Sequence, residues 1–144
     1  MRPRIWPKIV FTLLAASVAI ASDGASAQTV NLACGGVYHM YAPEEPMDAT
    51  LEPTSSSVDV ANKRITTPLG EYRISRVEDA QLYFDKPASP TFNFVTHGTL
   101  DRTTGKMLIR WMRPEEDAKV QVVGQTAHMA RYAEFTCSTA KRLF

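Results

Sequence analysis

Short segments of alternating apolar and polar residues, separated by turn-forming residues every eight to fifteen positions, dominate the sequence after residue 27. Such spacing is typical of an antiparallel all-β domain. No segment in this region has a convincing apolar stripe with the 3.6-residue period of a helix. The sequence predicts strands at Thr29–Tyr41, Ser57–Ala61, Gly70–Val77, Gln81–Asp85, Thr91–Arg102, Lys106–Arg113, Ala118–Gly124 and Ala127–Ser138.

Strands this short and this numerous can bury one face each in either of two architectures, a barrel or a sandwich. We therefore expect an all-β fold, a small antiparallel barrel or sandwich of about eight strands. Between Met107 and Met112 apolar residues occur at both odd and even positions, which face opposite sides of a strand. This predicts a strand that is covered on both faces and lies near the middle of the sheet. The proline-rich and acidic segment Ala42–Ser56 is predicted to be a long irregular connection.

The chain has two cysteines, Cys34 in the first predicted strand and Cys137 in the last. In an exported protein, such a pair is expected to form a disulfide. A disulfide that closes a loop of about 100 residues could stabilise the fold by up to about 4.7 kcal/mol in the chain-entropy model. A reactive thiol is the alternative, but neither cysteine has a CxxC neighbour or an adjacent helix start. Joining the first strand to the last favours a barrel over a sandwich.

The first 27 residues combine a basic start, an apolar run over Ile9–Ala21 and the triplet Ala25-Ser26-Ala27. This pattern predicts a secretory signal peptide, followed by a single β domain over residues 28–144 in the periplasm or outside the cell. The apolar run is shorter than the ~20 residues that span a bilayer, and we expect no transmembrane segment after cleavage. Lipidation of Cys34 is a rival interpretation, although Leu32 lies one position away from the lipoprotein pattern.

The stretch "GTLDRTTGKMLIRW", residues 98–111, has the most pronounced local pattern in the chain. It predicts a hairpin with a type I turn over Arg102–Gly105, in which Thr103 and Thr104 are central. Gly105 would take the left-handed conformation of a bulge before Lys106. Asp101 is expected to bond the backbone amides or threonine hydroxyls of the turn.

Three histidines, His39, His97 and His128, fall in predicted strands and could in principle converge on a metal ion. No HxH or HxxxH pair provides local chelation, so exposed or hydrogen-bonded strand histidines are favoured and no metal site is expected. His97 and Asp101 would lie roughly 13 Å apart along one strand, too far to form a catalytic pair.

Other catalytic and cofactor motifs are missing from the sequence as well. There is no GxSxG elbow, and the glycines after Cys34 precede no lysine or helix start and predict a strand bulge instead. Cleavage after residue 27 would leave 13 basic and 14 acidic residues, scattered singly, which gives no indication of a nucleic-acid partner. We expect a protein that is not an enzyme, with no catalytic residue and no cofactor.

Two parts of the sequence resemble an uncharacterised family of small exported proteins from Gram-negative soil bacteria. The first is Cys34-Gly35-Gly36 together with the G-x-L-D-R-x-T-G stretch at 98–105, and the second is the cysteine strand that ends in Lys141-Arg142-Leu143-Phe144. The resemblance covers most of residues 28–144. It implies a disulfide-closed β domain in the periplasm or outside the cell, and it implies no activity, ligand or site residue.

The partner is unknown from sequence, and two hypotheses follow. The first is an exported, non-enzymatic β domain that binds a small apolar ligand. The cavity for this ligand would be lined by Tyr38, Tyr41, Phe92, Phe94 and Trp111. The second is an envelope protein–protein interaction module that uses the 42–56 loop or the Leu143-Phe144 tail. Some periplasmic lysozyme inhibitors are disulfide-bearing barrels of this size, which is an analogy of fold and not of site.

Overall fold

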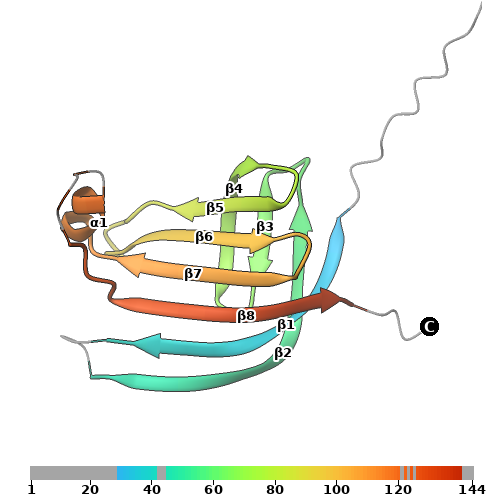
Figure 1. The fold of residues 1–144 in the computed structure, drawn as a ribbon, viewed down its shortest axis with the longest axis horizontal. Helices are drawn as coiled ribbons and strands as arrows, with labels where there is room; N and C mark the ends of the chain where they lie inside the picture. The colour runs from blue at the N-terminus through green and yellow to red at the C-terminus, as the bar shows by residue number, and fades with distance from the viewer. Residues whose placement is uncertain (1–28, 42–44, 121, 123, 125, 141–144) are drawn as a thin grey trace, which may run out of the picture.

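A computed structural model of the chain describes residues 29–41, 45–120 and 126–140, together with residues 122 and 124. These residues form eight strands and one helix, and each strand is antiparallel to the next (Figure 1). Pairing between the first and last strands closes the sheet into a barrel. The elements are β1 (Val30–Met40), β2 (Met47–Asp59), β3 (Arg64–Thr67), β4 (Gly70–Val77), β5 (Gln81–Lys86), β6 (Val95–Asp101), β7 (Lys106–Met112), α1 (Pro114–Val120) and β8 (Arg131–Thr139).

The all-β prediction is confirmed, and closure decides between its two alternatives in favour of the barrel. The predicted disulfide is confirmed as well, because Cys34 and Cys137 are directly opposite on β1 and β8 and are bonded. The bulge predicted for the glycines after Cys34 lies instead in the partner strand, because between the pairs Cys34–Thr54 and Gly36–Leu51 the single residue Gly35 faces two residues of β2, Glu52 and Pro53. The predicted signal peptide and the last four residues lie outside the described residues.

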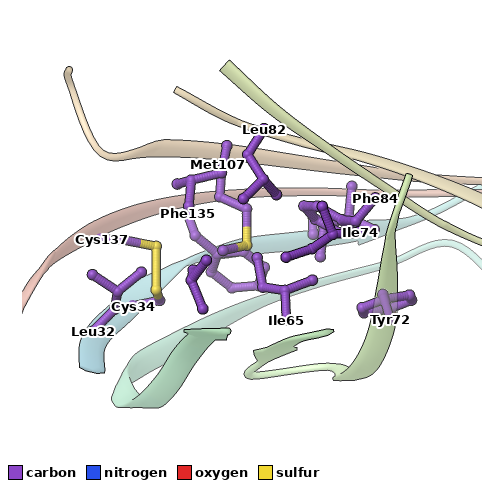
Figure 2. Packing of buried hydrophobic residues seen from close by; sticks show 14 of the residues in the cluster. Leu32, Cys34, Ile65, Tyr72, Ile74, Leu82, Phe84, Met107, Phe135 and Cys137 are labelled. Atoms are coloured by element: carbon purple, nitrogen blue, oxygen red, sulfur yellow. A yellow bond between two sulfur atoms is a disulfide. The ribbon is translucent and has the colours of Figure 1, made fainter. Parts of the chain in front are cut away.

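The core consists of the inward-facing residues of all eight strands (Figure 2). Phe84 and Phe135 are the largest side chains that are fully buried. Gly98 faces Phe84 across β5 and β6, and a Cβ at Gly98 would lie only 2.0 Å from the Phe84 ring. Glycine is therefore required here so that the Phe84 ring can pack against the backbone of β6.

The prediction of an irregular segment over 42–56 is wrong for most of its length, because β2 begins at Met47. Residues 47–54 pair with β1, while the pairing of β2 with β3 is confined to Ser57–Asp59. The first half of β2 is thus an edge strand within the described structure, and Pro53 lies where the register shifts. Prolines and charges are tolerated at open edges and bulges, which explains why the composition resembles a loop.

The strand predicted at Ala118–Gly124 is also wrong, because α1 occupies Pro114–Val120. Pro114 suits the first helical position. The three acidic residues that follow it in the first turn stabilise the helix, because their negative charges interact favourably with the positive end of the helix dipole. None of its residues is buried, so the helix needs no apolar stripe and left no periodic signal. The short strand β3 was also missed, because its four residues are too few to show a clear alternation of apolar and polar residues.

The prediction for Met107–Met112 also needs correction. In a closed barrel no strand is central. Up to Trp111, β7 alternates, with Met107, Ile109 and Trp111 facing inward and Leu108 facing outward with 36 % of its surface exposed, and Met112 at its end is buried as well. The β6 strand begins at Val95 rather than Thr91, because residues 89–92 form a turn closed by a bridge between Ser89 and Phe92.

Candidate functional site

The middle of the barrel is filled with side chains. Clefts lie on its outer face, one of about 460 Å³ beside α1, and at its two ends, where the inward-facing side chains of the strands form the lining. Ile65, Phe84, Met107, Ile109 and Phe135 are each at most 1 % exposed. On one side of this core lies the disulfide beside Leu32, and on the opposite side lies Tyr72 (Figure 2). We call the two regions the Asp101 end and the Trp111 end after a residue that lines the cleft at each.

The cleft at the Asp101 end is predominantly apolar and has a volume of about 380 Å³. Its floor is buried, with Leu82 and Leu100 at 1 % and 6 % exposure. Its rim is accessible, since Val30 and Val60 are 42 % and 48 % exposed. The other apolar lining residues are Leu32, Val58 and Cys137.

The turn between β6 and β7 forms one wall of this cleft. The Thr103 and Thr104 amides donate to Asp101 Oδ1 at 2.8 and 2.9 Å, and the Thr103 hydroxyl donates to the same oxygen at 2.6 Å. These bonds favour the carboxylate and lower the pKa of Asp101 to about 2, the Thr103 hydroxyl contributing most. Asp101 therefore holds the turn together as an anion at neutral pH.

Gly105 has a φ of 72°, in the left-handed region. Its amide donates to the carbonyl of Asp101 at 2.9 Å. A type I turn over Arg102–Gly105 would instead be closed by a bond to the carbonyl of Arg102, so the observed loop is one residue longer. The predicted turn is one residue too short, because the Asp101 side chain accepts from the amides of Thr103 and Thr104 and its carbonyl accepts from Gly105. The Gly105 carbonyl accepts from the Cys137 amide at 2.8 Å and so joins the turn to the disulfide strand.

Arg102 extends this wall to a neighbouring turn. Its Nη1 donates to the carbonyl oxygens of Glu78 and Asp79 at 2.9 and 3.3 Å, and its amide donates to the carbonyl of Ala80 at 2.8 Å. The β4–β5 and β6–β7 turns are thus fastened to one another. This wall of the apolar cleft is therefore held by hydrogen bonds within the fold.

The cleft at the Trp111 end is smaller, about 160 Å³, and of different chemistry. Aromatic residues from several strands meet here, including Tyr38 on β1 and Trp111 on β7, whose rings are 5.9 Å apart in an edge-on arrangement. Lys86 and Arg131 line the same cleft. Lys86 Nζ lies 5.5 Å from the Phe92 ring centroid, and Arg131 Cζ lies 4.7 Å from that of Phe94.

Tyr72 forms part of the same cleft and is 6 % exposed. Burial raises the pKa of its hydroxyl to about 12, although a hydrogen bond with Trp111 opposes this shift. The hydroxyl donates to the carbonyl of Leu69 at 3.3 Å. At neutral pH the tyrosine is therefore uncharged and adds no negative charge to the cleft.

The histidines do not converge. His39 Nδ1 lies 2.6 Å from Asp48 Oδ1, and His97 Nε2 lies 2.7 Å from Asp117 Oδ1 on α1. The backbone amide of His128 donates to Glu116 at 2.9 Å. In the described part of the chain, no three His, Cys, Asp or Glu side chains form a group that could hold a metal ion.

Of the aromatic residues predicted to line a ligand cavity, Tyr38, Phe92 and Trp111 do line the cleft at the Trp111 end. Phe94 packs against Phe92, and Tyr41 stacks instead on His39 at the outer surface. Sequence reasoning missed Lys86 and Arg131 as lining residues. Their positions could have been predicted, because residues two apart on a strand face the same side. Lys86 lies two positions from the inward-facing Phe84, and Arg131 lies two positions from the inward-facing Ala133.

No family model, curated protein or solved structure matches this chain. Among the described residues, no helix is long and apolar enough to cross a membrane. The geometry of the two clefts is therefore the basis for a functional proposal.

Proposed function

We propose that this protein is an exported, non-enzymatic β domain that binds a small apolar molecule in the cleft at the Asp101 end. The observation that carries the proposal is the cleft of about 380 Å³, whose volume lies within the range of small-molecule sites. Its exposed valines and buried leucines provide an apolar surface from rim to floor. Displacing water from such a surface favours binding by about 25 cal/mol per Å² buried.

The fixed rim supports the same proposal. Because the Asp101 turn is held by its own hydrogen bonds, little ordering of the protein is needed when the ligand enters. The charged groups at the rim are Asp101 and Arg102, and both have bonding partners within the fold. We therefore expect a neutral ligand rather than an ionic one.

The test is a titration with the neutral fluorescent probe N-phenyl-1-naphthylamine. Val60→Asp places a charge at the rim of the cleft and should weaken binding of the probe about tenfold, since a charge is poorly solvated beside an apolar ligand. Val120→Asp, at an equally exposed valine on α1, is the matched control and should bind like the wild type. Equal affinities in both variants, or no saturable binding at all, would refute the proposal.

A second function, protein–protein interaction, is favoured by the open edge of β2. Among the described residues, 47–54 pair only with β1, which leaves their outer backbone groups for an added strand. Thr50→Lys should remove a partner from a pull-down with envelope proteins without changing thermal stability. Deletion of residues 141–144 in a parallel sample tests the tail, and retention of the partner in both variants would reject this function.

A further inference from the structure

The cleft at the Trp111 end has a different chemistry from the apolar cleft of the proposed function. Lys86 and Arg131 occupy the last inward-facing positions at this end of β5 and β8. Each lies over the ring of a phenylalanine, and those two rings, Phe92 and Phe94, meet edge-on with centroids 5.5 Å apart. Two cations are thus positioned next to aromatic surfaces at the opening of one cleft.

We propose that this cleft binds a small aromatic carboxylate, with its ring among the aromatic walls and its carboxylate against Lys86 and Arg131. The volume of about 160 Å³ matches a single six-membered ring, since cavities of about 150 Å³ accept benzene. The walls for the ring are Trp111, Tyr38 and Phe92, which favour edge-on and offset contacts with a planar guest. A ligand of this class places one charge at the opening and none inside.

The charges around the cleft select an anion. Glu71 is the carboxylate that lines it, and Glu71 Oε2 lies 3.7 Å from Arg64 Nη1 with both side chains more than half exposed. Arg64 therefore offsets the charge of Glu71 locally. Lys86 makes no ion pair within the described residues, so its ammonium group can bind a carboxylate without breaking one.

The experiment is a titration of the full chain with benzoate, benzamide and inorganic phosphate. Trp111 fluorescence reports on the cleft once Trp6, the other tryptophan, has been replaced by phenylalanine. Benzoate should bind with a Kd on the order of 1 mM, as expected for a ligand of this size. Benzamide has the same shape without the charge, and it should bind at least about tenfold more weakly. Phosphate should not displace benzoate at equal concentration.

Lys86→Gln removes one cation at an exposed position and should weaken benzoate binding about tenfold. Lys106→Gln removes the same charge from an exposed position at the opposite end of the barrel and should have no effect. Arg131→Gln should resemble Lys86→Gln, and Arg131→Lys should retain most of the affinity. If Arg131→Gln fails to fold, the Lys86 and Lys106 pair still decides the question.

Three results would overturn the proposal: equal binding of benzoate and benzamide, equal affinities of the Lys86 and Lys106 variants, or displacement of benzoate by phosphate. The outcome is separable from that of the proposed function. Val60→Asp should leave benzoate binding unchanged, and Lys86→Gln should leave binding of the naphthylamine probe unchanged, because the two clefts lie at opposite ends of a filled barrel.

Discussion

The two ends of the barrel are built differently. At the Asp101 end the connections 60–63, 78–80 and 102–105 are short, and the turns are joined by backbone hydrogen bonds and by the nearby disulfide. At the Trp111 end the connection 68–69 is short as well, but the connections 87–94 and 113–130 are longer, and the last of these contains α1. At the Asp101 end the disulfide and the bonds of Asp101 and Arg102 join neighbouring turns, whereas at the Trp111 end aromatic rings and the cations Lys86 and Arg131 pack against one another. The difference teaches that one small domain can present clefts of different chemistry at its two ends.

Removing the disulfide should have the largest effect. The double substitution of Cys34 and Cys137 by alanine frees a loop with a sequence separation of 103 and should lower the free energy of unfolding by about 2 to 5 kcal/mol. Because Cys137 lines the apolar cleft, binding of the naphthylamine probe should weaken more than binding of benzoate. Guanidinium denaturation measures the first effect, and loss of benzoate binding alone would contradict the contrast between the ends.

Gly105→Ala should have the next largest effect. Besides its positive φ, a Cβ at this position would lie 2.1 Å from the carbonyl oxygen of Cys137, which is backbone and cannot easily move. We expect a loss of about 2 to 4 kcal/mol from strain and displacement of β8.

Gly124→Ala is the matched control for this substitution. Gly124 has a φ of 85° and no atom within 4 Å of an added Cβ, so only the backbone strain of about 1 to 2 kcal/mol is expected. Urea denaturation of both variants gives the comparison. Equal losses in the free energy of unfolding would mean that an added methyl group is accommodated as readily at the Asp101 end as in the connection to β8.

Asp101 provides a smaller, pH-dependent effect. Because its pKa is lowered from 3.8 to about 2 in the fold, the anion stabilises the native state above about pH 4, and this contribution is lost as the pH falls towards 2. Asp101→Asn should lower Tm by a few degrees at pH 7 and by progressively less below pH 4. Asp101→Ala should lower Tm at both pH values, since it also removes the hydrogen-bond acceptor. A pH-independent difference between wild type and Asp101→Asn would exclude a role for the charge.

The smallest effect is expected at α1. Asp117→Asn replaces the carboxylate that lies 2.7 Å from His97 Nε2, and because the His97 side chain is 43 % exposed the change should cost less than about 1 kcal/mol. Because none of the residues of α1 is buried, the helix contributes little to the core in either form. Thermal melting tests this expectation, and a loss as large as that of Gly105→Ala would show that the Trp111 end depends on α1 for its stability.

The elements that local chemistry specifies were predictable, and those specified by context were not. The β4 strand was predicted with its observed bounds because Gly70 begins it and alternation continues to Val77. By contrast, β2 resembled a loop because an open edge accepts the same prolines and acidic residues that a loop does. The helix α1 lacks a buried face, so its end signals at Pro114 and in the acidic first turn were outweighed by the absence of periodicity.

The candidate sites divide in the same way. Cys34 and Cys137 could be paired from sequence because they are the only two cysteines, and the Asp101 turn could be located because its residues lie together in the chain. The functional proposals, in contrast, depend on residues that are distant in sequence. Lys86, Trp111 and Arg131 come from three strands, and each taken alone is an ordinary strand residue.

The sequence by itself determined the strand alternation, the disulfide and the tight turn at Asp101, because these depend on side-chain parity, on cysteine number and on local hydrogen bonds. Only the tertiary structure decided that the sheet closes on itself with one apolar and one cationic end. The physical reason is that register and closure arise from the summed burial of all eight strands, so neighbours across the barrel are fixed only when every strand has found its partner.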